Sequence, residues 1–145
     1  MVTLQAAQAN RPLFGNLAQQ LYNTPTHGNG RQSLQCSFAT KLLHMVNPNA
    51  PIYDSLVAAF YFFQEPGRNK PLGQRIAAYV AFHTFLAEEY RRILANGLLA
   101  ASIQAFRQQF NPQHFTDEKV IDSLLWTYVA LLRSGGVTSG TIIYR

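Results

Sequence analysis

Apolar side chains recur every three or four residues along most of this chain, a spacing that buries one face of an α-helix. These stretches alternate with short segments rich in Asn, Pro and Gly, which are typical of turns and helix ends. Asn10 would cap the first helix, with Pro12 in its first turn, and Thr116 would cap the last one. The pattern predicts helices over residues 10–22, 34–46, 51–63, 71–96, 98–110 and 116–133.

No internal repeat, low-complexity tract or linker divides the sequence. We therefore predict one all-α domain over residues 1–136, a single compact orthogonal bundle of five or six helices. Residues 137–145 carry side chains common in β-strands but have no evident partner strand. We expect them to form a short irregular tail that is either flexible or docked on a partner subunit.

The surface of this protein has few charges, since only 13% of the residues are charged and 48% are hydrophobic. A surface of that kind is often partly buried by self-association. Four consecutive aromatic residues, at positions 60–63, would show every face of a helix. Either this helix is central and buried on all sides, or Tyr61 and Phe62 form the contact of a homodimer. The single tryptophan, Trp126, is most simply a core residue.

Metal and redox chemistry have little support in the sequence. The single cysteine, Cys36, rules out an internal disulfide and a cysteine-based zinc site. The four histidines show no metal-binding spacing and only seven residues are acidic, so we expect no metal and no cofactor. The N-terminus lacks the pattern of a signal peptide, and no apolar run is long enough to span a membrane. The expected location is the cytoplasm.

The net charge of +5 and the pI near 9.7 favour contact with a phosphate backbone, either DNA or RNA. The basic residues are dispersed along the chain, so an unfolded basic arm is not indicated. The alternative to a binding surface is a modestly basic surface that is simply solvated. Folding could gather five cations on one side as contacts to phosphate: Arg31, Lys41, Arg68, Lys70 and Arg75.

Two stretches, residues 37–44 and 47–57, place a lysine and an aspartate on either side of a proline-pinned bend. Lys41 lies less than two turns before the bend, and Asp54 would lie in the first turn of a helix that opens at Pro51. A partly desolvated lysine can act as an amine nucleophile, and an adjacent carboxylate can stabilise positive charge on a sugar. Lys41 and Asp54 are therefore candidate catalytic residues. The alternative is a helix-start aspartate in an ordinary ion pair.

The stretch Ser-Phe-Ala-Thr-Lys-Leu-Leu-His, followed by Asn-Pro and Pro-Ile-Tyr-Asp-Ser-Leu-Val, resembles a pattern in bacterial proteins of unknown function. Those proteins in turn resemble the core of the helix-hairpin-helix DNA glycosylases, such as 8-oxoguanine glycosylase and endonuclease III. The resemblance implies that Lys41 matches the Schiff-base lysine of these enzymes and that Asp54 matches their catalytic aspartate. Ser37 and Ala39 stand where the enzymes have two hairpin glycines, and most of the glycosylase body has no counterpart.

We interpret the chain as a small nucleic-acid-associated module that resembles a reduced glycosylase core without its catalysis. The first alternative is a helical interaction protein, for example an accessory factor of a mobile element or of host adaptation, which self-associates or binds a protein partner. The second alternative is a true DNA glycosylase or lyase that acts through Lys41 and Asp54.

Overall fold

The computed structural model describes the backbone of residues 4–25, 28, 30–135, 137–138 and 141–142, and the side chains of the residues within these ranges from 11 to 135. The described chain is all-α, as predicted, apart from a pair of two-residue strands near its end. Its elements are α1 (Leu4–Asn23), α2 (Cys36–Val46), α3 (Ser55–Phe60), α4 (Leu72–Ala95), α5 (Ala100–Phe110), α6 (Asp117–Arg133), β1 (Val137–Thr138) and β2 (Thr141–Ile142).

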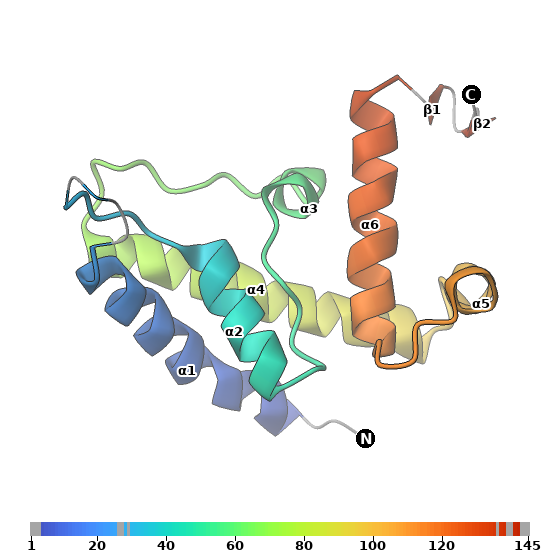
Figure 1. Ribbon diagram of the computed structural model, residues 1–145, viewed down its shortest axis with the longest axis horizontal. Helices are drawn as coiled ribbons and strands as arrows, with labels where there is room; N and C mark the ends of the chain where they lie inside the picture. The colour runs from blue at the N-terminus through green and yellow to red at the C-terminus, as the bar shows by residue number, and fades with distance from the viewer. Residues whose placement is uncertain (1–3, 26–27, 29, 136, 139–140, 143–145) are drawn as a thin grey trace.

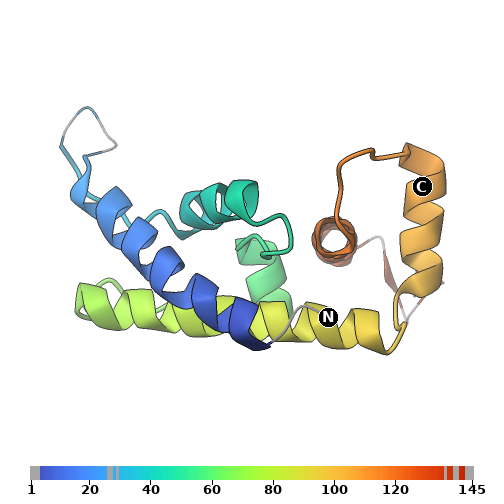
Figure 2. The same cartoon turned by 90° about the horizontal axis from the view of Figure 1, so that it is seen from below.

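The longest helix, α4, forms the axis along which the other helices are arranged (Figure 1). Helices α1 and α2 lie along its N-terminal half, and α1 packs against both α2 and α4. Helix α6 stands across the C-terminal half of α4, and Figure 2 shows it end-on. Helix α5 lies beyond α6 at the far end. The helices therefore cross at steep angles, as predicted for an orthogonal bundle.

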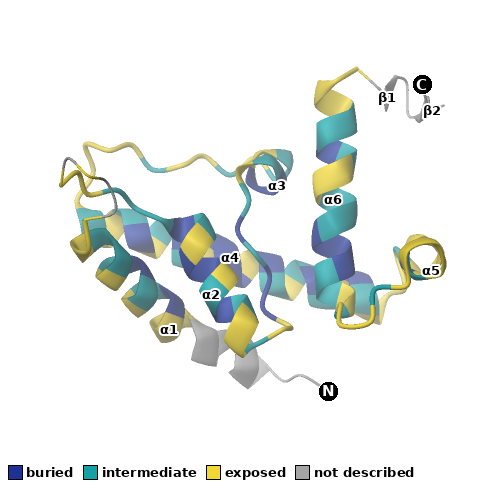
Figure 3. Ribbon diagram, viewed as in Figure 1, coloured by how far each residue is buried: buried dark blue, intermediate teal, exposed yellow. Residues whose placement is uncertain are grey.

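The hydrophobic core lies where α4 meets the other helices (Figure 3). The apolar stripes of the sequence meet there in one cluster, which excludes water from the centre of the molecule. Its most completely buried side chains come from five helices: Phe14 of α1, Leu43 of α2, Val57 of α3, Leu86 and Tyr90 of α4, and Ile121 of α6.

Helix α4 ends at the glycine that the sequence indicated. Gly97 has a φ of +61°, a left-handed conformation that residues with a β-carbon rarely adopt. Its N–H donates to the carbonyl of Leu94 at 3.2 Å, and the N–H of Leu98 donates to the carbonyl of Ile93 at 3.0 Å. These two bonds form a Schellman motif, which satisfies the last carbonyl groups of the helix.

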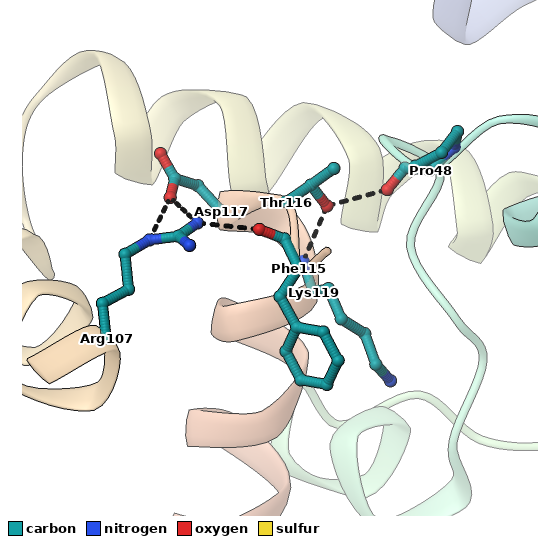
Figure 4. Close-up of polar contacts among 6 residues, drawn as sticks. All are labelled: Pro48, Arg107, Phe115, Thr116, Asp117 and Lys119. Carbon is teal, nitrogen blue, oxygen red and sulfur yellow. Dashed lines mark hydrogen bonds and ion pairs between the residues drawn. The ribbon is translucent and has the colours of Figure 1, made fainter. Parts of the chain in front are cut away.

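Figure 4 shows how the start of α6 is fixed. The hydroxyl oxygen of Thr116 accepts a hydrogen bond from the N–H of Lys119 at 3.3 Å, so the predicted cap is confirmed. The Arg107 guanidinium of α5 pairs with Asp117 at 2.6 Å and donates to the carbonyl of Phe115 at 3.0 Å. These contacts join α5 to the first turn of α6.

Helix α1 is one continuous helix, without the start that the sequence indicated at Asn10. It starts at Leu4 and runs through Asn10, so the predicted cap at Asn10 is wrong. Pro12 lies inside the helix, where its missing N–H removes one helical hydrogen bond. Tertiary packing holds this part of α1 in place, because the ring of Phe14 is buried against α4, 5.1 Å from the ring of His83.

Helix α3 is much shorter than the helix predicted over residues 51–63, which is wrong at both ends. Residues 51–54 are not helical, because backbone groups of residues 51–53 bond to side chains of α2, α4 and α6. At the other end, Phe62 adopts a φ of +59°, which a continuing helix does not allow.

The four aromatic residues at 60–63 therefore do not share one helix, and the prediction of a helix buried on all sides is wrong. Tyr61 is half-buried, with its ring 5.3 Å from that of Phe85. The ring of Phe63 stacks on Phe82 with the centroids 4.4 Å apart. Phe62 points away from the core and is 90% exposed. The predicted homodimer contact through Tyr61 and Phe62 stays a prediction.

Near the C-terminus, β1 pairs with β2 in an antiparallel register that joins Val137 to Ile142 and Thr138 to Thr141. The sequence showed no partner for this segment, and the partner is the neighbouring part of the tail itself. The other residues of 137–145 lie outside the described part of the chain, so a flexible tail or one docked on a second subunit stays a prediction.

Candidate functional site

The connecting segment, residues 47–54, joins α2 to α3 without helix or strand. Because a carbonyl can only accept a hydrogen bond, each histidine nitrogen that bonds to this segment carries the hydrogen. Burial lowers the pKa of His83, which keeps that ring neutral. Three side chains donate hydrogen bonds to carbonyl groups of the connecting segment, each at 2.8 Å. His44 Nδ1 of α2 donates to Ala50, and His83 Nε2 of α4 donates to Pro51. The hydroxyl of Thr116, the cap of α6, donates to Pro48 (Figure 4).

Two backbone N–H groups of the connecting segment donate to buried side chains. The N–H of Ile52 donates to Asp122 Oδ2 at 3.2 Å, and the N–H of Tyr53 donates to the Thr40 hydroxyl at 2.9 Å. Asp122 Oδ1 also accepts from the Tyr90 hydroxyl at 2.5 Å. Asp122 is 7% exposed, and its burial raises the pKa of the carboxyl to about 6. The segment is thus held through its N–H groups as well as through its carbonyl groups.

Asp54 ends the connecting segment and caps α3. Its Oδ1 accepts hydrogen bonds from the N–H of Leu56 at 2.7 Å and from that of Val57 at 3.4 Å. The expected place of Asp54 in the first turn of a helix that opens at Pro51 is therefore wrong, since the residue precedes the helix. Asp54 Oδ2 makes no hydrogen bond with any described residue, so it stays available to a ligand.

Lys41 and Asp54 line the same hollow, a cavity of about 280 Å³ between α2, the connecting segment and α6. We call it the Lys41 hollow. The structure thus brings together the two residues that the sequence singled out as a candidate catalytic pair. No hydrogen bond or ion pair joins them in the described structure. The Lys41 side chain is exposed and has no such partner among the described residues.

Sequence reasoning missed Trp126 and Lys119, which line the hollow from α6. The prediction that Trp126 is a core residue is wrong, because its side chain is 49% exposed. One signal could have found it. Lys119, Ser123 and Trp126 follow one another at intervals of four and three residues, so they share one face of α6.

The five cations predicted to contact phosphate lie at different places. Arg31, Arg68 and Arg75 line a second cavity of about 460 Å³, which we call the arginine pocket. Lys41 lines the Lys41 hollow, and Lys70 lines neither cavity. The five cations predicted to gather on one side therefore do not share one cavity.

No group of three His, Cys, Asp or Glu side chains that could hold a metal ion occurs among the described residues. Burial raises the pKa of the Cys36 thiol to about 12, and the side chain is 4% exposed, so this cysteine is not a reactive thiolate. Within the described part of the chain, no helix has the length and apolar character that crossing a membrane requires.

Comparison of the chain with protein-family models, with curated proteins and with solved structures found no match. We therefore infer the function from the residues of the two cavities.

Proposed function

We propose that this protein binds nucleic acid with unpaired bases, and that one base stacks on Trp126 in the Lys41 hollow. The observation that carries the proposal is the exposed ring of Trp126 in the same hollow as Lys41 and Lys119. Proteins that bind single strands combine aromatic side chains, on which bases stack, with cations that contact the backbone. The net charge of +5 supports the same class of ligand.

The size of the Lys41 hollow suits one base better than a large cofactor. Its volume of about 280 Å³ lies below the roughly 300–1,000 Å³ of most sites for drug-sized ligands. Because about half of the Trp126 surface is exposed, a base can cover the ring without displacing any core side chain. The ammonium groups of Lys41 and Lys119 then contact the flanking phosphates.

In this proposal Asp54 is a binding residue. Its Oδ1 holds the N–H groups at the start of α3, and its Oδ2 accepts a hydrogen bond from an amino or imino group of the bound base. Nucleophilic lysines are usually desolvated, whereas Lys41 is exposed to solvent. The proposed function is therefore binding without bond cleavage.

The single tryptophan of the chain gives a direct test. We expect a short single-stranded oligonucleotide to quench the fluorescence of Trp126 at low ionic strength, and added salt to reverse the effect. A strand of the same length and charge without bases should bind without quenching. If neither DNA nor RNA strands bind at low salt, the proposal is wrong.

Variants of the protein test whether the Lys41 hollow is the binding site. Fluorescence anisotropy of a labelled strand measures the affinity of each variant. Trp126→Ala should weaken binding by about 1–3 kcal/mol through lost stacking. Lys41→Ala and Lys119→Ala should each weaken binding and lower the slope of its salt dependence by about one. Lys70→Ala is the matched control, because Lys70 lines neither cavity and its loss removes the same charge. An equal loss for Lys70→Ala would contradict the assignment to the hollow.

A further inference from the structure

The chain segments that line the arginine pocket meet at the end of the molecule where α4 begins, as Figure 1 shows for their backbone. Its walls come from the end of α1, residues 31–34, residues 65–68 and the first turns of α4. Arg31, Arg68 and Arg75 belong to three of these four segments. The fold, and not a run of basic residues in the sequence, therefore gathers the positive charge.

Among the described residues that line the arginine pocket, only Glu65 is acidic. Its Oε1 accepts a hydrogen bond from the hydroxyl of Tyr53 at 2.5 Å. Guanidinium groups stay protonated at all physiological pH values, so three positively charged groups and one carboxyl group line the pocket. Like charges repel one another when they share a cavity, and a bound anion would relieve that repulsion.

A second observation concerns Arg75. Its Nε is buried and has no hydrogen-bond partner among the described residues. Native proteins rarely leave a buried donor without a partner, so an unsatisfied one needs an explanation. Because the Arg75 side chain also lines the arginine pocket, a small rotation of this side chain would let the N–H donate to an oxygen bound there.

We propose that the arginine pocket binds a phosphomonoester, the terminal phosphate of a nucleic acid strand or of a free nucleotide. Such a group carries about −1.5 to −2 charges at neutral pH and three acceptor oxygens, which match several guanidinium groups. A phosphate inside a strand carries a single charge and continues the chain in both directions, so a pocket suits a strand end better. Tyr22 also lines the pocket, so its aromatic side chain would contact the terminal base.

Calorimetric titrations with dTMP, thymidine and inorganic phosphate test this pocket independently of the Lys41 hollow. We expect dTMP and inorganic phosphate to bind and thymidine to give no signal, and dTMP should leave the fluorescence of Trp126 unchanged. Arg68→Gln should lower the affinity for dTMP at least about tenfold through the loss of charge-assisted hydrogen bonds. Arg75→Lys, which keeps the charge but loses the planar guanidinium group, should also lower the affinity for dTMP. Lys70→Gln is the matched control and should bind dTMP as the wild type does.

Two strands that differ only in a 5′-phosphate or a 5′-hydroxyl distinguish the sources of the phosphate. A preference for the 5′-phosphate that Arg68→Gln abolishes assigns the pocket to strand ends. Binding of dTMP without such a preference assigns it to free nucleotides. If dTMP does not bind and the two strands bind equally, the proposal is overturned. Binding of dTMP that quenches Trp126 and is unchanged in Arg68→Gln places the ligand elsewhere and also overturns it.

Discussion

The hydroxyl of Thr40 on α2 accepts a hydrogen bond from the backbone N–H of Tyr53, and both residues are buried. Each is the direct neighbour of a residue of the Lys41 hollow, since Lys41 follows Thr40 and Asp54 follows Tyr53. This bond therefore ties the backbone next to Lys41 directly to the backbone next to Asp54.

Thr40→Val should lower the free energy of unfolding by about 1–3 kcal/mol, because it leaves the buried N–H of Tyr53 without an acceptor. Urea unfolding measures the loss, and hydrogen exchange locates it at the Tyr53 amide. Thr40→Ser keeps the oxygen and removes only a methyl group, so the Tyr53 amide should stay protected in that variant. Equal loss of protection in both variants would show that the hydrogen bond does not hold the segment.

The stability of the protein should depend on the charge of Asp122. Burial raises its pKa from 3.8 to about 6, so the folded state holds this proton more tightly than the unfolded state. The resulting contribution to stability is complete below the unfolded pKa and is lost as the pH rises through the folded one. The free energy of unfolding should therefore fall by about 3 kcal/mol as Asp122 loses its proton in the folded state. His83 acts in the opposite sense, because a lowered histidine pKa removes stability as the pH falls.

Comparison with Asp122→Asn separates the two effects. The free energy of unfolding of the wild type should fall, relative to that of the variant, as the pH rises from about 4 to about 7. Urea unfolding of both proteins across this range measures the difference. A difference that does not change with pH would mean that Asp122 ionises in the folded protein as it does in the unfolded chain.

The cap formed by Asp54 contributes to stability apart from any ligand. Asp54→Ala should cost about 0.5–2 kcal/mol, because the N–H groups of Leu56 and Val57 lose their acceptor. Asp54→Ser retains a capping oxygen and should recover most of this loss. Thermal unfolding of the two variants checks the prediction, which fails if serine is no better than alanine.

Lys41 should not form a covalent adduct with DNA. An exposed amine remains solvated and is a poor nucleophile towards a sugar carbon, unlike the desolvated lysines of Schiff-base enzymes. Borohydride reduction in the presence of DNA with damaged or missing bases tests this. A trapped complex that Lys41→Ala abolishes would instead establish the lyase that the glycosylase resemblance implies.

Phe62 should be replaceable with a gain in stability. Its φ of +59° is strained for a residue with a β-carbon, and its ring is 90% exposed. Phe62→Gly should raise the free energy of unfolding by about 1 kcal/mol, whereas Phe62→Ala keeps the strain and should not. If the ring forms the predicted homodimer contact, both variants should shift the mass measured by light scattering towards the monomer.

Features that depend on neighbouring residues could be predicted from the sequence. The stop at Gly97 and the cap at Thr116 are local, so their residue types were enough. The shared position of Lys41 and Asp54 could also be expected, because the bend between them is short.

The connecting segment and Trp126 could not be predicted in this way. Pro51 is a common first residue of a helix, but the carbonyl of Pro51 bonds to His83, 32 residues away, and the N–H of Ile52 bonds to Asp122, 70 residues away. Local propensity does not include such distant partners. Trp126 was misplaced for the same reason, since only the docking of α6 decides which of its faces stays open.

The hydrogen bonds that link the connecting segment to Thr116 and Asp122 span 68 and 70 residues of chain. Contacts between such distant residues form late in folding, after the local helices, because a long loop must first close. A nascent chain that has not yet released α6 from the ribosome already contains Lys41 and Asp54 but has no cavity around them. A ligand could therefore bind in the Lys41 hollow only after α6 has been synthesised and has packed in place.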